Sequence, residues 1–289
     1  MNANLALNDS VYSDAALAAM GEYIEARAWQ DIVAAAPPWL QELTGISATE
    51  RDGVLLLASS QVKHLLFNRV IGLGEHSPAT DEQVAALMDH YWTLGIEHYW
   101  VHAGPYAQPT RLGRLLQRHG LKPFQRSWVK MMRPAKRVPQ LDGNVNVRAA
   151  RLEDGPAIAS IAGPAFDLPQ RAAELYAALI ERPRWRVFVA EIGGEIAGTA
   201  GLYVEGEVAY HAFAATRPEL RRRGAQRALL QTRINAASEA GCRWIATETG
   251  FPLAADESNP SYQNMLWAGF RPVAIRDNYA PAGARWSDC

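Results

Sequence analysis

The sequence has little cysteine, almost no net charge and no recognisable metal-binding spacing. Only two cysteines occur in 289 residues, Cys242 and Cys289, and neither forms a CxxC or Cys/His pattern. This argues against a metal site and for a reducing compartment, so we expect a cytoplasmic protein. The formal net charge is −1, which argues against nucleic acid as a partner.

Long hydrophobic runs are also absent. The first ten residues, MNANLALNDS, contain no basic segment followed by an apolar run, so we expect no secretory signal. The longest apolar runs, such as Val54–Ala58, are far too short to cross a bilayer, and we expect no membrane association. The chain is 48% hydrophobic and 20% charged, which is typical of a soluble protein with room for two ordinary domains.

The most informative stretch runs from His211 to Gly241. A strand of small and aromatic residues leads into an arginine-rich loop, and a helix follows with apolar residues at Leu230, Ile234 and Ala237. Gly241 marks its end. The loop therefore leads into a helix N-terminus, whose unpaired N–H groups and dipole attract anions. This order of elements predicts a binding site for a diphosphate.

Two alternatives compete with the diphosphate site. An arginine run can be a solvated surface or a nucleic-acid patch. The loop is neither a Walker loop nor a GxGxxG motif, which excludes the common nucleoside triphosphate and dinucleotide sites. Gly224 removes a Cβ where backbone must approach a ligand, and Arg221, Arg222 and Arg223 add positive charge. We therefore favour the diphosphate site.

These residues resemble a known family. Arg221-Arg222-Arg223-Gly224-Ala225-Gln226 is similar to the acyl-CoA loop of the GNAT superfamily of N-acetyltransferases, Arg/Gln-x-x-Gly-x-Gly/Ala, and Pro218 lies where that family often has proline. Gln226 departs from the final Gly or Ala. The resemblance covers about Asn144 to Tyr279 and implies acetyl-CoA as the acyl donor and an amine as the acceptor, in a small molecule or a peptide.

The resemblance also assigns roles along the neighbouring elements. It implies that the strand Tyr210–Thr216 supplies a backbone N–H to the oxyanion and lies along the pantetheine arm, with walls from Phe213, Ala214 and Ala215. Asn259 and Asn264, on the helix that follows, lie where the family contacts the cofactor with polar side chains. The alternatives are a helix cap for Asn259 and surface exposure for Asn264.

Removal of the amine proton requires a base, because an alkyl ammonium has a pKa near ~10.4. Glu248, at a strand end, is the first candidate, and its alternative is a solvated carboxylate. His211 is the second, although a histidine within a strand is more often a hydrogen-bonded core residue. Tyr210 occupies a place where some family members carry a glutamate, but a phenol is a poor base and is better suited to positioning substrate or water.

The resemblance also implies a tyrosine acid that protonates the leaving thiolate. The family's usual tyrosine position is occupied here by Met265. Tyr262, nearly one turn earlier on the same predicted helix, either substitutes for it or packs in the core. Because a thiol has a pKa of about 8.5, it leaves tolerably as thiolate without an acid.

Strands alternate with helices throughout, which indicates an α/β fold with a mixed sheet flanked by helices. In the first half we expect helical structure in Tyr12–Ala36, Asp81–Leu94 and Thr110–His119, and extended structure in Gly53–Ser59, His64–Ile71, Glu97–His102 and Phe124–Met132. In the second half we expect helices in Asp154–Phe166, Arg171–Glu181, the stretch between Gly224 and Gly241, and Asn259–Ala268. We also expect strands in Val145–Arg148, Glu207–Thr216 and Arg243–Thr249, a hairpin around Gly193-Gly194, and an extended end from Gly269.

The two halves resemble copies of one unit. LGIEHYW around Gly95 and AGCRWIA around Gly241 are each a helix stop followed by an aromatic strand. The alternative is that two unrelated α/β domains have similar helix-ending residues by chance. We expect two tandem GNAT-like domains, a degenerate one at 1–135 and an acyl-CoA-binding one at 144–289, joined by a Pro/Gly/basic linker.

The first copy lacks the chemistry of the acyl-CoA loop. When the two halves are aligned on these glycines, Glu75 lies opposite Arg221 and Pro78 opposite Gly224, which replaces positive charge by negative charge and removes an N–H donor. We therefore expect an N-acetyltransferase, monomeric or homodimeric, that binds one acyl-CoA per chain. The main alternative is a non-catalytic acyl-CoA sensor or scaffold.

Overall fold

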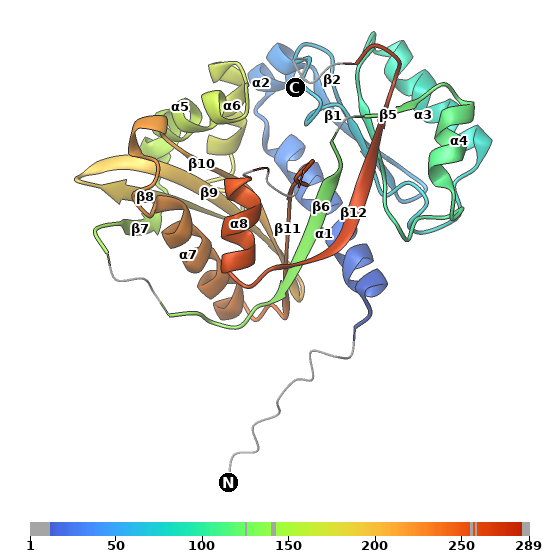
Figure 1. Ribbon diagram of the computed structural model, residues 1–289. Coiled ribbons are helices and arrows are strands. Elements are labelled where there is room, and N and C mark those ends of the chain that lie inside the picture. The colour runs from blue at the N-terminus through green and yellow to red at the C-terminus, as the bar shows by residue number, and fades with distance from the viewer. Residues whose placement is uncertain (1–11, 125, 140–142, 255–256, 258, 285–289) are drawn as a thin grey trace.

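The computed structural model describes residues 12–124, 126–139, 143–254, 257 and 259–284 (Figure 1). Cys289, the N-terminal residues 1–11 and the middle of the expected linker lie outside these ranges, whereas Cys242 is free and buried. No helix in the described ranges combines the length and apolarity needed to cross a bilayer. The same residues include no cluster of three or more His, Cys, Asp or Glu side chains arranged to hold a metal ion.

The first half contains four α-helices and six strands in its described residues. Its elements are α1 (Asp14–Ala35), α2 (Pro38–Thr44), β1 (Ile46–Arg51), β2 (Val54–Ser59), β3 (Arg69–Ile71), α3 (Asp81–Thr93), β4 (Trp100–Ala103), α4 (Leu112–Arg118), β5 (Lys122–Pro123) and β6 (Trp128–Pro134). Helix α1 begins at the Ser13 cap, whose side chain accepts a hydrogen bond from the Ala16 N–H, and ends before Pro37-Pro38 as expected.

The second half follows the expected order of elements. They are β7 (Asn146–Ala149), α5 (Gly155–Ala165), α6 (Gln170–Ala177), β8 (Trp185–Ile192), β9 (Glu195–Glu205), β10 (Val208–Thr216), α7 (Ala225–Glu239), β11 (Trp244–Gly250), α8 (Pro260–Trp267) and β12 (Arg271–Ala280). The hairpin between β8 and β9 is confirmed, with positive φ at both Gly193 and Gly194, as a tight hairpin turn requires.

One 12-stranded mixed sheet runs through both halves, in the order β1-β2-β3-β4-β12-β6-β11-β10-β9-β8-β7, with β5 paired to β12. The last strands of the two halves are exchanged: β6 pairs with β11, and β12 pairs with β4. They also pair with each other, and Figure 1 shows them side by side across the middle of the molecule. The division at 135/144 stays a prediction, because hydrogen bonds cross between the halves along these two strands.

The same β-α-β unit occurs in both halves. Strands β3 and β4 are parallel and joined through α3, and β10 and β11 are parallel and joined through α7. Parallel neighbours need such a crossover. The α/β fold class, with mixed sheet and flanking helices, is therefore confirmed.

One expected strand is mostly a turn. Of His64–Ile71, only Arg69–Ile71 is a strand. The side-chain amide of Asn68 donates to the carbonyls of Val62 and His64, and the Phe67 N–H donates to the His64 carbonyl, which folds the segment back. Strand β1 and helix α2 were not expected. Strand β1 carries few of the branched or aromatic residues that mark strands.

His64 makes stability depend on pH. Burial lowers its pKa to about 4, and its ring Nδ1 accepts a hydrogen bond from the Leu66 N–H at 3.1 Å. A histidine with a depressed pKa stabilises the fold fully above its unfolded pKa of about 6.5, and this contribution is lost as pH falls toward 4. We expect the free energy of unfolding to fall by up to about 3 kcal/mol over this window.

Urea unfolding over a pH series measures this effect. The variant His64→Asn keeps an acceptor near Nδ1 but cannot titrate, and should lose this part of the pH dependence. His76→Asn, at an exposed position, should keep it. If the free energy of unfolding depends on pH equally in the wild type and in His64→Asn, another group is responsible.

Candidate acyl-CoA site

The site lies where two parallel strands separate. Strand β10 pairs with β11 only from Val208 to Tyr210, opposite Trp244 to Ala246. Beyond this point β10 stays on β9 and β11 stays on β6, and the β10–β9 register shifts between His211 and Ala214. The separation opens a cavity of about 1410 Å³ between the strands, bounded by the loop before α7 and by α8.

The arginine-rich loop forms one end of this cavity. Arg221, Arg222 and Arg223 are exposed, and Arg222 has φ 61°, so its backbone turns sharply. Gly224 is the N-cap of α7 with φ 95°, in the left-handed region that favours glycine. No side chain in the described ranges caps this helix and no acid lies in its first turn. Its first N–H groups and its positive dipole end are therefore available to an anion.

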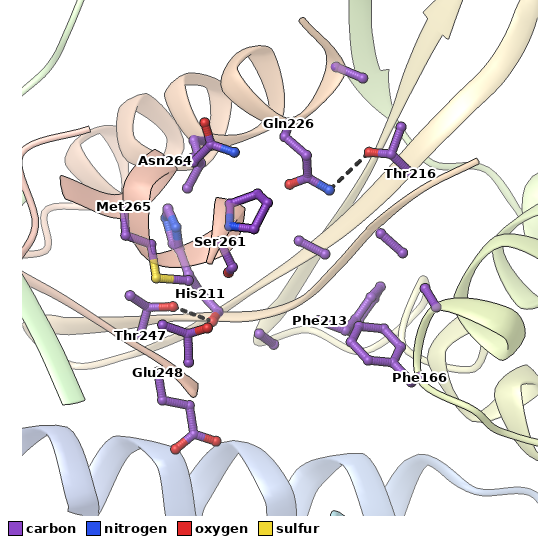
Figure 2. Close-up of a pocket in the computed structure, with 18 of the residues that line it drawn as sticks. Phe166, His211, Phe213, Thr216, Gln226, Thr247, Glu248, Ser261, Asn264 and Met265 are labelled. Atoms are coloured by element: carbon purple, nitrogen blue, oxygen red, sulfur yellow. Dashed lines mark hydrogen bonds between the residues drawn. The ribbon is translucent and has the colours of Figure 1, made fainter. Parts of the chain in front are cut away.

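Gln226 explains how the loop tolerates a departure from the family pattern. Its side-chain amide donates to the hydroxyl of Thr216 at 2.9 Å, which ties the first turn of α7 to the end of β10 (Figure 2). Ala225 beside it is buried. Gln226 and Ala225 both line the cavity.

The expected pantetheine strand also borders the cavity. Phe213, Ala214 and Ala215 all line it. The Phe213 ring packs on Tyr176, with ring centroids 4.3 Å apart, and faces Phe166 in Figure 2. Because β11 has diverged from β10 here, the backbone edge of β10 is not paired with β11.

The two asparagines of α8 have different surroundings. Asn259 is the N-cap: its side chain accepts from the Tyr262 N–H at 3.1 Å and donates to the Gly250 carbonyl at 2.7 Å. The capping alternative therefore describes its hydrogen bonds, although it also lines the cavity. Asn264 is half-buried and lies along the cavity with Ser261 and Met265 (Figure 2). Contact of either asparagine with a cofactor stays a prediction.

Glu248 is not a solvated strand-end carboxylate. Its side chain is only 7% exposed. It belongs to a charge-balanced group of six side chains, here termed the buried ion cluster: Glu22, Glu25, Arg69, Lys130, Glu248 and Arg276. Its carboxylate lies 3.1 Å from Arg69, 3.6 Å from Lys130 and in contact with Arg276. In Figure 2 it points toward α1, away from α7 and α8.

The ion cluster sets the protonation of its carboxylates. Burial disfavours the charged form of Glu248, but Arg69, Arg276 and Lys130 outweigh burial and hold its pKa well below the usual range. Burial raises the pKa of Glu25, which lies on α1 within 3.2 Å of Arg69. A carboxylate with so low a pKa is a weak base, and the assignment of Glu248 as base stays a prediction.

Tyr210 and His211 are both buried and both line the cavity. Burial, followed by the charge of Glu248, raises the pKa of Tyr210 well above its usual value, so its phenol stays protonated. Burial, followed by the charges of Arg233 and Arg133, lowers the pKa of His211 well below its usual value, so its imidazole stays neutral. Neither environment favours a proton acceptor near neutral pH.

Met265, not Tyr262, faces the cavity from α8. Figure 2 shows Met265 beside Thr247 and His211, whereas Tyr262 packs edge-to-face on Phe251 with ring centroids 6.0 Å apart. The packing alternative thus describes the surroundings of Tyr262, and its role as acid stays a prediction.

Sequence reasoning missed the wall that the first half contributes. The residues concerned are Trp29, Ile32, Leu66, Arg126 and Trp128. It also missed five members of the ion cluster. A usable signal was present, because Arg69, Lys130 and Arg276 each interrupt a predominantly apolar, extended run, where a charged side chain requires a partner.

Comparisons with known proteins agree with this geometry. Residues 156–255 match the model of the acetyltransferase (GNAT) family. A GCN5-related N-acetyltransferase from Kribbella flavida superposes with a TM-score of 0.63 at 16% identity, over 93% of this chain and 97% of its own. A tandem GNAT protein from the clavulanic acid biosynthesis pathway superposes with a TM-score of 0.59 at 14% identity, over 95% and 98%. No curated protein matches in sequence.

The split sheet, the glycine-capped helix and the exposed basic loop together form a candidate site for an anionic ligand. The second half contains a domain of the GNAT acetyltransferase family. The whole chain has the fold of GNAT N-acetyltransferases, including a tandem GNAT protein. The resemblance to the GNAT superfamily is therefore confirmed, and the assignment of Arg221–Gln226 as its acyl-CoA loop stays a prediction.

Proposed function

We propose that this protein is an N-acyltransferase that moves an acetyl group from acetyl-CoA to a primary amine by direct attack on the thioester. The observation that carries the proposal is the open N-terminus of α7, with its Gly224 cap and three exposed arginines, at the end of the cavity between β10 and β11. The diphosphate of CoA suits the helix N-terminus and the arginines. The β10 edge suits the pantetheine amides.

The acceptor amine enters from the side of the first half. Trp29 and Ile32 of α1, with Leu66 and Trp128, contribute apolar lining to the cavity. Glu248 points toward α1 in Figure 2. The amine nitrogen attacks the carbonyl carbon, the C–S bond breaks, and the ammonium proton must leave. Because the Glu248 carboxylate is held by Arg69 and Arg276, we assign removal of this proton to water within the cavity.

Thiol release from acetyl-CoA, measured against a panel of primary amines, tests the proposal. Amine-dependent release, together with an acetylated product of the expected mass, is the expected result. The acyl-CoA sensor remains the second candidate because Met265 occupies the usual acid position in the cavity. Tight CoA binding without thiol release above the hydrolysis rate, for any amine, would favour the sensor and contradict the enzyme.

We expect one CoA per chain, because the corresponding helix of the first half is already capped. The N-cap of α3 is Thr80, which forms a capping box with Gln83, and Asp81 and Glu82 place negative charge in its first turn. Aligned by helix caps, Thr80 rather than Pro78 lies opposite Gly224.

The loop before α3 is also filled by protein. The Gln108 N–H donates to the Gly74 carbonyl at 2.8 Å, and the Ala79 N–H donates to the Gln108 carbonyl at 2.8 Å. This segment occupies the space beside the loop. Native mass spectrometry with a CoA titration should therefore saturate at one ligand per chain, and two equivalent ligands would contradict the reasoning.

A further inference from the structure

Arg233, near the middle of α7, is an almost fully buried arginine that lines the cavity. Its exposed fraction is 2%. Its Nε donates to the Leu229 carbonyl at 3.2 Å, and its Nη1 donates to the carbonyls of Gly201 at 3.2 Å and Ala212 at 3.4 Å. The guanidinium therefore reaches from the helix to two neighbouring strands of the sheet.

No carboxylate in the described parts of the chain lies within ion-pair distance of this guanidinium. By contrast, Arg69 and Arg276, which are equally buried, each contact two or more carboxylates of the ion cluster. Burial lowers the pKa of Arg233 to about 9, which expresses the cost of a buried cation without a counter-ion. Such a cation is stabilised by any anion that enters the cavity.

The position of this charge indicates which anion it meets. Ala212 lies in the stretch where the β10 register shifts and where β10 has just left β11, directly before the expected pantetheine strand Phe213–Ala215. His211 and Phe213 mark this stretch in Figure 2. Met265 and Thr247 line the same part of the cavity, at the place where the family's usual acid is missing.

We propose that Arg233 is the cation that stabilises the sulfur and oxygen of the reacting thioester, in place of the missing tyrosine acid. When the amine attacks, the carbonyl oxygen gains negative charge, and when the C–S bond breaks, its electron pair stays on the CoA sulfur. A guanidinium in a site of low dielectric stabilises both charges without giving up a proton. The product thiolate then takes a proton from water.

This inference rests on the proposed acyl-CoA site, but its test does not need the acceptor amine. The probe is CoA itself, and the readout is the thiolate ultraviolet absorbance of bound CoA across a pH series. We expect the thiol of CoA in the wild-type complex to titrate about one unit or more below the free thiol at about 8.5. Arg233→Lys should retain part of the shift, and Arg233→Met should abolish it.

Arg133 is the matched control. It is also a buried arginine that donates to backbone carbonyls, those of Pro134, Lys136 and Ala268, but it does not line the cavity. Arg133→Met should change the pKa of the bound CoA thiol far less than Arg233→Met does. A merely structural role of Arg233 would change stability in both variants without moving the thiol titration.

The outcomes separate the inference from the proposed function. If CoA binds and its thiol titrates in the wild-type complex as it does free in solution, the role of Arg233 is overturned and the acyl-CoA site stands. This holds even if Arg233→Met does not fold. If calorimetry detects no CoA binding to the wild type, the proposed function fails and the inference fails with it.

Discussion

Replacing Gly224 by valine should lower the affinity for CoA and acetyl-CoA by about 100-fold or more, equivalent to about 2.7 kcal/mol. Gly224 has φ 95°, a backbone conformation that a β-branched residue adopts only with strain. A valine forces the cap of α7 to move, and its side chain enters the space where we propose that the backbone meets the diphosphate. Both effects misplace the first N–H groups of the helix. Isothermal titration calorimetry with CoA measures the change.

Gly194→Val is the matched control for backbone strain. Gly194 lies in the β8–β9 hairpin with φ 86°, and nothing lies within 4 Å of a Cβ added there. This variant should lose comparable stability yet bind CoA as the wild type does. Wild-type CoA affinity in Gly224→Val would remove the α7 N-terminus from the binding site.

Replacing Arg276 by methionine should lower the free energy of unfolding by about 3–5 kcal/mol, because one partner of a buried ionic network is removed. Arg276 lies 2.9 Å from Glu22 and 2.9 Å from Glu25, and it contacts Glu248. Without it, Arg69 and Lys130 must balance three buried carboxylates. Arg276→Lys keeps the charge but loses the forked geometry, and it should lose less stability.

Arg271→Met provides the comparison on the same strand. Arg271 is paired with Asp14 of α1 at 2.7 Å, and both side chains are about half exposed. An exposed pair contributes only about 0–1 kcal/mol. Urea unfolding at neutral pH should therefore separate the two variants clearly. Similar losses for Arg276→Met and Arg271→Met would show that the ion cluster does not connect α1 to the sheet as described.

The ion cluster also shows why strand exchange is stable in this fold. Its six residues come from α1, β3, β6, β11 and β12, so both exchanged strands and both halves contribute. The three cations pair with Glu22 and Glu25 of α1. Helix α1 crosses the junction of the halves (Figure 1). Separation of the halves would leave these charges without their partners, which disfavours independent opening.

Local patterns were sufficient to predict most of the fold. The apolar period of α7, the Gly193-Gly194 turn and the glycines after α3, α4 and α7 depend on residues close in sequence, and all were found where expected. The Arg221–Gln226 loop belongs to the same class, because a glycine cap and a helix N-terminus are local features. The error at His64–Phe67 was local as well. The apolar residues of this segment are typical of a strand, but hydrogen bonds from the Asn68 side chain hold the segment in a turn.

The pairing of distant charges could not be read from the sequence. Glu248 is an ordinary glutamate at a strand end until α1, β3 and β12 place Arg69 and Arg276 beside it and depress its pKa. The sequence also did not show that Tyr262 packs on Phe251 and that Met265, on the same helix, faces the cavity.

The sequence by itself determined the class of fold and predicted the diphosphate loop, because both depend on periodicity, turns and residue types within short segments. Only the tertiary structure decided the exchange of β6 and β12, the wall contributed by Trp29 and Trp128, and the isolation of the Arg233 charge. Hydrogen-bond partners of strands and counter-ions of buried charges are chosen across the whole chain, by which groups the sheet brings within a few ångströms, and no local pattern encodes that choice.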